Sequence, residues 1–400
     1  MFEHVEPYPG DPILTLNETF GQDPRPGKVN LSIGIYFDDA GQLPVMQAVR
    51  EAEASVAGTV SARPYLPMEG LAAYRQAVQH LLWGPEHEAV KSHRIATIQT
   101  VGGSGGLKVG SDFLKCYFPD SEVWVSDPTW DNHQSIFRGA GLKVHTYPYH
   151  DPITGGLRFD DMLATLQNLP LRSIVLLHAC CHNPTGIDLS PHQWNALIPV
   201  IRSRQLIPYL DMAYQGFGDG LVEDAAALHA LTNAGISFFC ANSFSKSFSL
   251  YGERCGALSV VCPDASQASR VLGQLKATIR KNYSSPPSHG ARLVAQVLQT
   301  PALYRAWADE LGSMRQRIKA MRQCVAEGLA SALPGYDVSR FTRQRGMFSY
   351  TGLSETQVNA LRERYGVYLL RSGRMCVAGL NARNVGAVTQ AFAHVISHPV

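Results

Sequence analysis

Between residues 45 and 262, short runs of consecutive apolar residues alternate with segments that carry helix signals. The runs cover residues 95–98, 123–125, 173–177, 206–210 and 237–240. Because consecutive apolar residues bury both faces of a strand, such runs are typical of a parallel sheet with helices on both sides. Ser190, followed by Pro191, marks the start of one of these helices. The alternation predicts an α/β fold, and Pro208 favours an edge position or a bend for the fourth strand.

The pattern becomes mainly helical after residue 262. Apolar side chains at 303, 307, 311, 314, 318, 321, 325 and 329 recur every three or four residues, which predicts one long amphipathic helix. We expect the basic residues beside this stripe to form its solvated face: Arg315, Arg317, Lys319 and Arg322. A short strand near residues 347–350 and a helix that begins with the capping box of Ser354 and Gln357 come next. A final strand and a C-terminal helix complete a smaller α+β domain.

Composition excludes several classes of protein. The 35 Lys and Arg residues exceed the 33 Asp and Glu residues by two, so the chain lacks the basic excess of a nucleic-acid-binding protein. No run approaches the roughly 18 apolar residues of a membrane helix, and the acidic N-terminal residues do not resemble a signal peptide. The eight cysteines form no C-x-x-C pair, so we expect them to be buried and reduced, as in a cytoplasmic protein.

The glycine loop, which we define as residues 102–106 (Gly-Gly-Ser-Gly-Gly), follows a predicted strand and precedes a helix. It matches neither G-x-G-x-x-G nor a Walker motif. It does match G-x-S-x-G, which would make Ser104 the nucleophile of an α/β-hydrolase, although no H-G-G-G oxyanion motif is present. We favour a phosphate-binding turn at a helix N-terminus, and a tight turn without a ligand is the third interpretation.

Lys246 follows a predicted buried strand within Ser243-Phe244-Ser245-Lys246. The S-x-x-K match to β-lactamases fails because the chain has no S-D-N or K-T-G. A lysine among apolar residues loses its proton more readily and can attack a carbonyl carbon. Since hydroxyls and Arg254 stand near it in the sequence, a phosphorylated aldehyde is the fitting partner, and that description matches pyridoxal 5′-phosphate.

Asp211 ends the strand at 206–210, at the carboxyl edge where open α/β sheets bind ligands. A carboxylate there would keep the cofactor's pyridine nitrogen protonated, and Tyr214 could donate a hydrogen bond to the ring oxygen. His178 and His182 are four residues apart but lie at the end of a strand and lack H-E-x-x-H. We therefore expect no metal site.

Taken together, these motifs resemble the class I, fold-type I, pyridoxal-phosphate aminotransferases of the aspartate aminotransferase family, and most of all its bacterial aromatic-amino-acid (tyrosine) members. The matching stretches occur in family order over nearly the whole chain, at residues 126–130, 180–186, 211–217, 243–246, 280–287, 345–349 and 372–375. The resemblance implies a large cofactor domain with a mostly parallel sheet over residues 45–311. It also implies a small α+β domain assembled from residues 1–44 and 312–400.

The resemblance implies a role for each motif residue. Lys246 would bind the cofactor as an internal aldimine and then move the proton between substrate and cofactor, with Asp211 on the pyridinium. Tyr214 and Asn183 would hydrogen-bond the ring oxygen, and Trp130 would stack on the ring. The phosphate would be held by Gly103, Ser104, Ser243, Ser245 and Arg254.

The resemblance also implies the substrate contacts. Arg374 would bind the α-carboxylate through two hydrogen bonds, beside Trp130 and Asn183, and Gly34 would belong to the entrance segment. Tyr65 and Arg280 would reach the neighbouring subunit's phosphate and distal substrate carboxylate, which implies a homodimer with shared active sites. Arg371 departs from the family, which commonly has a small residue there; it would either point to solvent or perturb the substrate loop.

The predicted reaction is transamination between an aromatic amino acid and 2-oxoglutarate, with aspartate as a further donor. The alternatives are an aspartate aminotransferase, a serine hydrolase acting through Ser104, and the ligand-sensing part of a transcription regulator. We expect no DNA-binding module, since the enzyme-like sequence begins almost at once.

Overall fold

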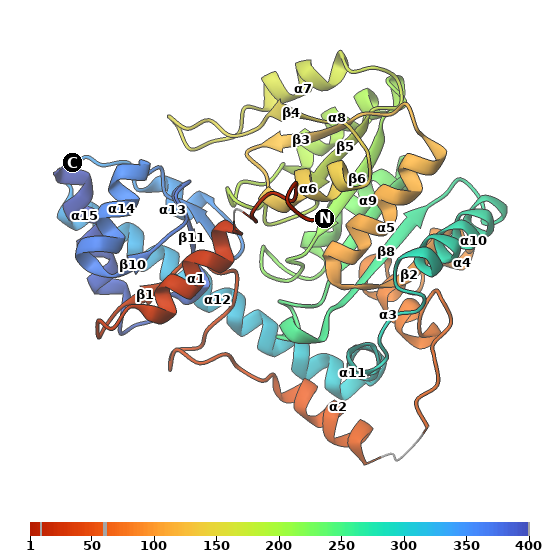
Figure 1. Cartoon of the computed structure of the whole chain (residues 1–400), viewed down its shortest axis with the longest axis horizontal. Helices are drawn as coiled ribbons and strands as arrows, with labels where there is room; N and C mark the ends of the chain where they lie inside the picture. Colours follow the sequence, from red (N-terminus) through yellow and green to blue (C-terminus); the bar gives the residue numbers. More distant parts are fainter. Residues whose placement is uncertain (9, 59–61, 399–400) are drawn as a thin grey trace. The chain divides into compact units, whose positions relative to one another are not determined.

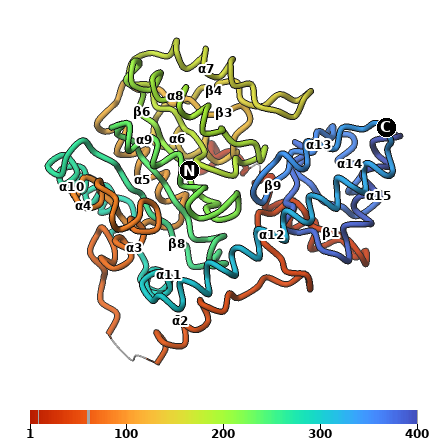
Figure 2. The backbone as a smooth tube through the Cα atoms, turned by 180° about the vertical axis from the view of Figure 1, so that it is seen from behind, coloured from red at the N-terminus to blue at the C-terminus, as the bar shows by residue number. Residues whose placement is uncertain are grey.

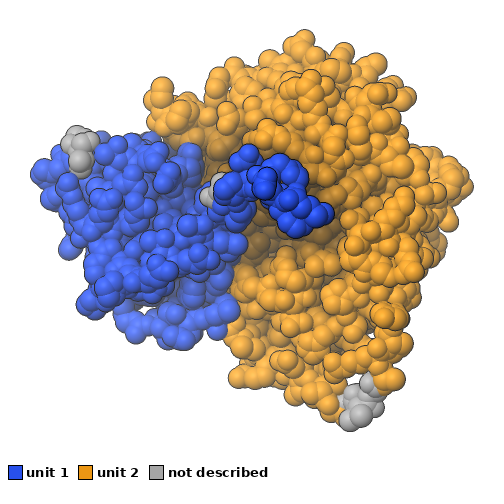
Figure 3. Space-filling model, in the orientation of Figure 1, with its two compact units in different colours: residues 1–43, 317–400 blue, residues 44–316 orange. Residues whose placement is uncertain are grey.

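The computed structural model describes residues 1–8, 10–58 and 62–398 (Figure 1). The chain forms two compact units, Pro44–Gln316 and the combination of Met1–Leu43 with Arg317–Val400 (Figure 3). The sequence puts the division after residues 44 and 311. That the two units are separate domains stays a prediction, because compactness alone does not show that they fold or move independently.

A seven-stranded sheet with the order β2-β8-β7-β6-β5-β3-β4 forms the centre of the larger unit. Strand β8 is antiparallel to both of its neighbours, and the other pairs are parallel. The strands are β2 Ile95–Val101, β3 Val123–Asp127, β4 Val144–Pro148, β5 Ile174–His178, β6 Ile207–Met212, β7 Phe238–Ser243 and β8 Cys255–Val261. Five of them coincide with the apolar runs, so the predicted mostly parallel α/β sheet is confirmed.

The edge position predicted from Pro208 is wrong, because β6 lies between β5 and β7 near the middle of the sheet. The N–H of Ile207 donates to Ser173 of the β5 side, so the next residue, Pro208, turns its nitrogen toward β7. The pairing of β6 with β7 begins only at Tyr209. The proline therefore stands where no ladder hydrogen bond is needed, which is why a central strand tolerates it.

Helices surround this sheet (Figure 2). Helices α5 and α10 contact β2 and β8, α3 contacts the same two strands, and α8 lies against α7 and α9. The helices of this unit before α12 are α2 Gln47–Ala57, α3 Ala72–Trp83, α4 Glu88–Lys91, α5 Gly102–Tyr117, α6 Asp131–Gly139, α7 Phe159–Gln167, α8 Pro191–Ser203, α9 Ala226–Asn233, α10 Ala265–Asn282 and α11 His289–Gln299. Two 3₁₀ turns, η1 Glu223–Ala225 and η2 Tyr251–Glu253, follow β6 and β7. The expected site residues lie at the carboxyl ends of the parallel strands and in the loops that follow them.

The smaller unit combines both ends of the chain. Strand β1 (Val29–Asn30) pairs in parallel with β10 (Val367–Tyr368), and β9 (Phe348–Tyr350) pairs antiparallel with β11 (Arg374–Cys376). Its helices are α1 Pro12–Gln22, α13 Ser339–Arg343, α14 Glu355–Tyr365, the 3₁₀ turn η3 Val377–Gly379 and α15 Val385–Ser397. The capping box of Ser354 and Gln357 begins α14 as predicted.

Helix α12 (Pro301–Ala332) is the predicted amphipathic helix, and the side chains of its apolar stripe from Trp307 to Leu329 are buried. The solvated face predicted beside it is largely wrong. Only Lys319 is exposed, whereas Arg315 and Arg317 are half-buried and Arg322 is buried. Arg322 is only 3% exposed because carbonyl and hydroxyl oxygens from residues 341–349 accept its hydrogen bonds.

The cysteines lie in the described part of the chain, and all eight are free. Six of them are buried as expected, but Cys116 is exposed and Cys324 is half-buried, so that expectation is wrong for these two. Over residues 1–8, 10–58 and 62–398, no helix combines the length and the apolar character needed to cross a bilayer.

Candidate active site

The carboxyl ends of β5, β6 and β7 bring together residues that are far apart in the sequence. Asp211 lies on β6, Tyr214 follows that strand, Asn183 follows β5, and Lys246 follows β7. Because the three strands are parallel neighbours, their carboxyl ends share one edge of the sheet. The fold therefore places the four predicted residues at the edge where this class of sheet binds ligands.

Lys246 stands at the ring of Tyr214, with its Nζ 4.8 Å from the ring centre. The lysine is half-buried, and the residues around it in the chain, Phe244 and Phe248, are fully buried. Trp307 of α12 stacks on Phe248 with ring centres 4.7 Å apart and donates its indole N–H to the carbonyl of Ser247 over 2.7 Å. The loop that carries the lysine is therefore held by aromatic packing and by a buried hydrogen bond to the next residue.

Asp211 is 5% exposed and shares a hydrogen bond with His133, with Oδ2 and Nε2 2.9 Å apart. The other ring nitrogen of His133 lies 2.8 Å from the hydroxyl of Thr129. Burial raises the pKa of Asp211, but the hydrogen bond to His133 and electrostatic interactions with the neighbouring imidazoles and Lys246 outweigh this effect and hold the pKa below its usual value. A carboxylate that stays ionised while buried can pair with a cationic ring nitrogen.

His133, the hydrogen-bond partner of Asp211, is a residue of this cluster that sequence reasoning missed. It is fully buried on α6, and 78 positions separate it from Asp211 in the chain. The only local signal was its place three residues after Trp130, at the start of a helix. A contact over such a separation becomes visible only when α6 and β6 have been placed together.

His178 and His182 lie next to this pair, with ring centres 4.2 Å apart. Burial and, to a smaller extent, the neighbouring His133 lower the pKa of His178 to about 3, although Asp211 partly opposes the shift. His178 is half-buried, whereas His182 is only 1% exposed. The ring nitrogens of His182 lie 2.9 Å from the hydroxyl of Ser126 and 2.8 Å from that of Thr185. Both imidazoles are therefore neutral near pH 7.

Two groups of side chains have the spacing of metal ligands within the described residues. In the first group, His133, His178 and Asp211, the aspartate and His133 bind each other. In the second, Cys180, Cys181 and Asp224, the carboxylate already accepts backbone N–H groups of the loop at 216–219. These contacts occupy ligand atoms in both groups, and the absence of a metal stays a prediction.

The glycine loop starts α5, with Gly103 and Ser104 in the first turn. Gly102 has a positive φ of 66°, and a Cβ there would lie 2.4 Å from Nη2 of Arg254, so only glycine permits this approach. Arg254 also donates to the hydroxyl of Ser245 over 3.2 Å. A Cβ on Gly103 would lie 3.2 Å from the Cβ of Ser243. Among the described residues no side chain caps the helix N-terminus, and the N–H of Gly102 donates to the carbonyl of Arg254 over 2.9 Å. The next N–H groups of the first turn, an arginine and two hydroxyls form a setting that suits a phosphate.

The hydrolase interpretation of Ser104 finds no support in this geometry. A nucleophile elbow places its serine in a strained turn beside a histidine. Here the residue with positive φ is Gly102, and Ser104 lies within α5. In the part of the chain that the structure describes, no histidine hydrogen-bonds to its hydroxyl.

Trp130 immediately precedes α6 and is half-buried. Its ring meets that of His133 edge to face, with centres 5.1 Å apart. Asn183 is 4% exposed at the end of β5. Trp130 thus contacts His133, the hydrogen-bond partner of Asp211, and Asn183 follows β5, the strand beside β6.

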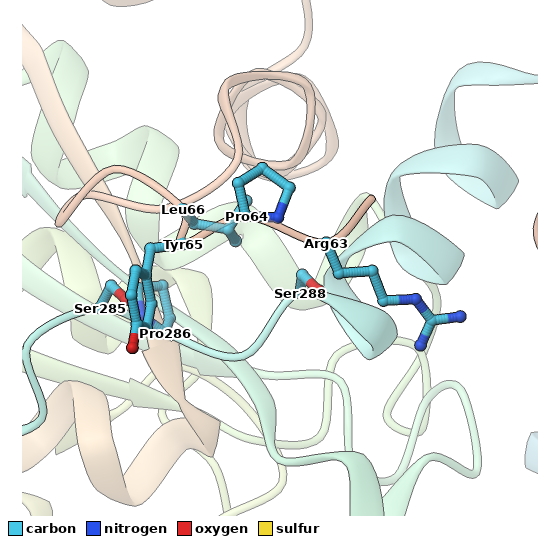
Figure 4. Close-up of a pocket in the computed structure, with 7 residues that line it drawn as sticks. All are labelled: Arg63, Pro64, Tyr65, Leu66, Ser285, Pro286 and Ser288. Atoms are coloured by element: carbon cyan, nitrogen blue, oxygen red, sulfur yellow. The ribbon is translucent and has the colours of Figure 1, made fainter. Parts of the chain in front are cut away.

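Tyr65 and Arg280 are exposed instead of joining that cluster. Tyr65 is 96% exposed and lines a cavity of about 290 Å³ beside Ser285 and Pro286 (Figure 4). Arg280 lies near the end of α10 and donates to the hydroxyl of Ser284. A tyrosine with so little of its surface covered by its own chain is available to another molecule.

Arg374 lies on β11 in the smaller unit and is 3% exposed. Its guanidinium carbon is 4.3 Å from the ring centre of Phe348, and its Nη2 donates to the carbonyl of Ser32 over 2.6 Å. A Cβ on Gly34 would lie 2.9 Å from Cζ of Phe348, so Gly34 touches the same ring. Arg371 is different: its side chain is 77% exposed and lies 3.7 Å from Glu355, so it points to solvent.

This fold and site define a protein of the aminotransferase class. The family described as aminotransferase class I and II matches residues 26–392, and the chain belongs to it. The tyrosine aminotransferase of Klebsiella pneumoniae is 60% identical over 397 residues, which cover 99% of this chain and 100% of that protein.

Solved structures agree with this. An aromatic amino acid aminotransferase from Burkholderia cenocepacia J2315 has a TM-score of 0.96 and 61% identity, with 99% of both chains covered. An aromatic-amino-acid aminotransferase from Burkholderia pseudomallei, covalently bound to pyridoxal phosphate, has a TM-score of 0.97 and 49% identity, again with 99% of both chains covered. The predicted family and fold are confirmed.

Proposed function

We propose that the protein is a pyridoxal-phosphate-dependent transaminase that moves the amino group of aromatic L-amino acids to 2-oxoglutarate. The observation that carries the proposal is the Lys246 amine at the ring of Tyr214, on the same sheet edge as the ionised Asp211. The names of the relatives, tyrosine and aromatic-amino-acid aminotransferase, support the aromatic substrate. The choice of 2-oxoglutarate as acceptor rests on the family resemblance alone.

The side chains fit pyridoxal phosphate at three points. The N-terminus of α5 with Arg254 suits the phosphate, the lysine suits the aldehyde, and the carboxylate of Asp211 suits the pyridine nitrogen. When bound, the cofactor supplies an electron sink for the charge that develops at the substrate Cα. Asp211, kept ionised by His133, holds the ring nitrogen proton.

We assign the remaining roles to residues of this chain. Lys246 holds the cofactor and, once released, carries the proton to and from the substrate Cα. Tyr214 and Asn183 orient the ring oxygen, Trp130 covers the ring, and Arg374 binds the substrate α-carboxylate. Gly103, Ser104, Ser243 and Ser245 complete the phosphate contacts.

We further propose a homodimer in which Tyr65 and Arg280 serve the partner's site. Their exposure in the single chain supports this, because a tyrosine that is 96% exposed is covered very little by its own chain. Arg280 would pair the distal carboxylate of 2-oxoglutarate and would have to be screened or displaced when an aromatic ring occupies the same space. Residence in the cytoplasm stays a prediction that rests on the free cysteines.

The visible spectrum of the purified protein tests the proposal. A cofactor bound through Lys246 absorbs visible light, and borohydride bleaches that band while attaching the cofactor to the peptide that contains Lys246. Addition of tyrosine, phenylalanine or aspartate should then change the spectrum, and the relative rates decide between an aromatic and an aspartate preference. A colourless protein, or labelling of a different lysine, would contradict the proposal.

The Lys246→Ala variant is the control for this experiment. We expect it to retain pyridoxal phosphate through the phosphate contacts but to show no borohydride labelling and no turnover. Lys276→Ala changes a lysine elsewhere in the larger unit, which pairs with Glu69, and should leave labelling and turnover unchanged. Ordinary turnover by Lys246→Ala would refute the assignment of this lysine.

A further inference from the structure

A buried arginine without an assigned role lies in the smaller unit. Arg322 projects from α12 and is 3% exposed. Its guanidinium donates to the carbonyls of Gly346 over 2.9 Å and Phe341 over 3.3 Å, to the hydroxyl of Ser349 over 2.9 Å, and to the carbonyl of Phe348. One side chain thus holds the segment that leads from α13 into β9.

A buried guanidinium is costly unless its N–H groups are satisfied, so these acceptors and Arg322 depend on each other. The hydroxyl of Ser349 extends the network, because it donates in turn to Oε1 of Gln344. Gln344 also accepts the backbone N–H of Tyr350 and donates to its carbonyl over 3.0 Å. The position of strand β9 is therefore set from the side of α12.

Because β9 pairs with β11, the position of β9 also determines the position of Arg374. Cys376 lies opposite Phe348, Met375 opposite Ser349, and Arg374 opposite Tyr350. Opposed residues of an antiparallel pair share a face, so Phe348 and Arg374 are diagonal neighbours on one face while Ser349 points to the other. Arg322 binds Ser349 on that second face, and Arg374 lies against the Phe348 ring on the first, 4.3 Å from its centre.

We propose that Arg322 is a positioning residue for Arg374. Through the backbone of β9, it fixes the Phe348 ring against which the Arg374 guanidinium and Gly34 both lie. This inference rests on the proposed function, in which Arg374 binds the α-carboxylate that amino-acid and 2-oxo-acid substrates share. Arg322 itself touches no substrate and acts only on how tightly that carboxylate is held.

The test replaces Arg322 by lysine in the holoenzyme. Lysine keeps the charge, but its compact ammonium cannot reach all the acceptors that the planar guanidinium of arginine reaches at once. We expect Arg322→Lys to raise the KM of phenylalanine and of 2-oxoglutarate by about tenfold, because a displaced carboxylate-binding group loses affinity in both directions of the reaction. The kcat should stay within about threefold, since a loss of uniform binding changes KM and leaves kcat.

The matched control is Arg343→Lys, the same substitution in α13, where the arginine is exposed and 3.9 Å from Asp337. It should change neither KM nor kcat. Ser349→Ala is a milder second variant in case Arg322→Lys does not fold: it removes one acceptor of Arg322 and should raise both KM values about threefold. The visible absorption of the bound cofactor should be the same in all variants.

Direct binding of 3-phenylpropanoate, a phenylalanine analogue without an amino group, separates this inference from the proposed function. Its Kd should rise by the same factor as KM in Arg322→Lys and in Ser349→Ala. If the wild type binds this carboxylate but transaminates nothing, the proposed function fails while the Kd ratio still decides the role of Arg322. An unchanged Kd and KM, with only a smaller active fraction or a lower Tm, would show that Arg322 merely stabilises the fold and would overturn the inference.

Discussion

The loop that carries Lys246 depends on Trp307, and the variant Trp307→Phe measures that dependence. Phenylalanine retains a ring against Phe248 but loses the indole N–H that donates to the Ser247 carbonyl over 2.7 Å. Trp307 is fully buried and Ser247 is 4% exposed, so water cannot replace the lost donor without entering the core. The carbonyl next to Lys246 is left without this hydrogen bond.

The expected loss of stability has two parts. A buried acceptor that loses its donor costs about 1–3 kcal/mol. The smaller ring leaves a cavity of roughly 40 Å³, which at about 24 cal/mol per Å³ adds about 1 kcal/mol. Trp307→Phe should therefore lower the free energy of unfolding by about 2–4 kcal/mol, as measured by urea denaturation followed by circular dichroism.

The matched control is Trp83→Phe. Trp83 is also buried, 3% exposed, and donates its indole N–H over 3.0 Å, but to the hydroxyl of Thr232 in α9. The two substitutions remove the same atoms and similar hydrogen bonds, so their effects on the free energy of unfolding should be alike. Only Trp307→Phe should reduce kcat, by about tenfold to a hundredfold, because a displacement of about 1 Å in a reacting amine is enough for such a loss.

Two outcomes would refute this reasoning. Equal kcat values for wild type and Trp307→Phe, despite the loss of stability, would show that the lysine loop keeps its position without the indole. A comparable fall of kcat in Trp83→Phe would show that the effect comes from general loosening of the larger unit. The amount of bound pyridoxal phosphate should be measured in each variant, so that kcat refers to loaded enzyme.

Two further predictions concern charge. Arg280→Ala should lower kcat/KM for aspartate and 2-oxoglutarate by about a hundredfold while leaving phenylalanine within a few-fold, because only the former present a distal carboxylate; equal losses on both substrates would contradict that division. His178 gives a pH dependence of stability. Burial holds its pKa at about 3, below the ordinary 6.5, so between these values the unfolded chain binds the extra proton and stability falls as the pH decreases below 6.5. At pH 5 the loss is roughly 2 kcal/mol, and His178→Asn should remove about that much of the difference between urea unfolding at pH 7 and at pH 5; an unchanged difference would show that His178 is not buried in its neutral form.

The sequence predicted the parts of this protein that depend on local pattern. The apolar run at 173–177 predicts a strand because both of its faces are buried. The glycine loop predicts a strand-to-helix junction, and in the structure Gly102 adopts a φ of 66° there, close to Arg254. The chemistry of the cofactor joined Lys246 and Asp211 in one predicted site, and the family order of the motifs supported it. The side chains themselves would not have shown that the two strands are neighbours.

Residues that act through distant partners escaped prediction. The position of His133 three residues after Trp130 is a weak local signal, and its importance comes from Asp211, which β6 places beside it. Pro208, in contrast, has a strong local signal that led to a wrong prediction. Proline is usually confined to edge strands, but here the pairing of β6 with β7 starts one residue later, at Tyr209, so Pro208 can lie in a central strand.

Arg322 shows where the rule that charges mark the solvated face of a helix fails. On α12 the buried stripe includes Met321 and Val325, so residue 322 lies at the border of that stripe, where a long side chain can turn either way. The direction is decided by oxygen acceptors at 341–349, which the helix pattern does not contain. Whether a charged side chain at such a border is buried or exposed is therefore better predicted from the later segments of the chain that can pack against the helix and offer carbonyl acceptors. In this chain that segment is the one that carries Phe348, the neighbour of Arg374.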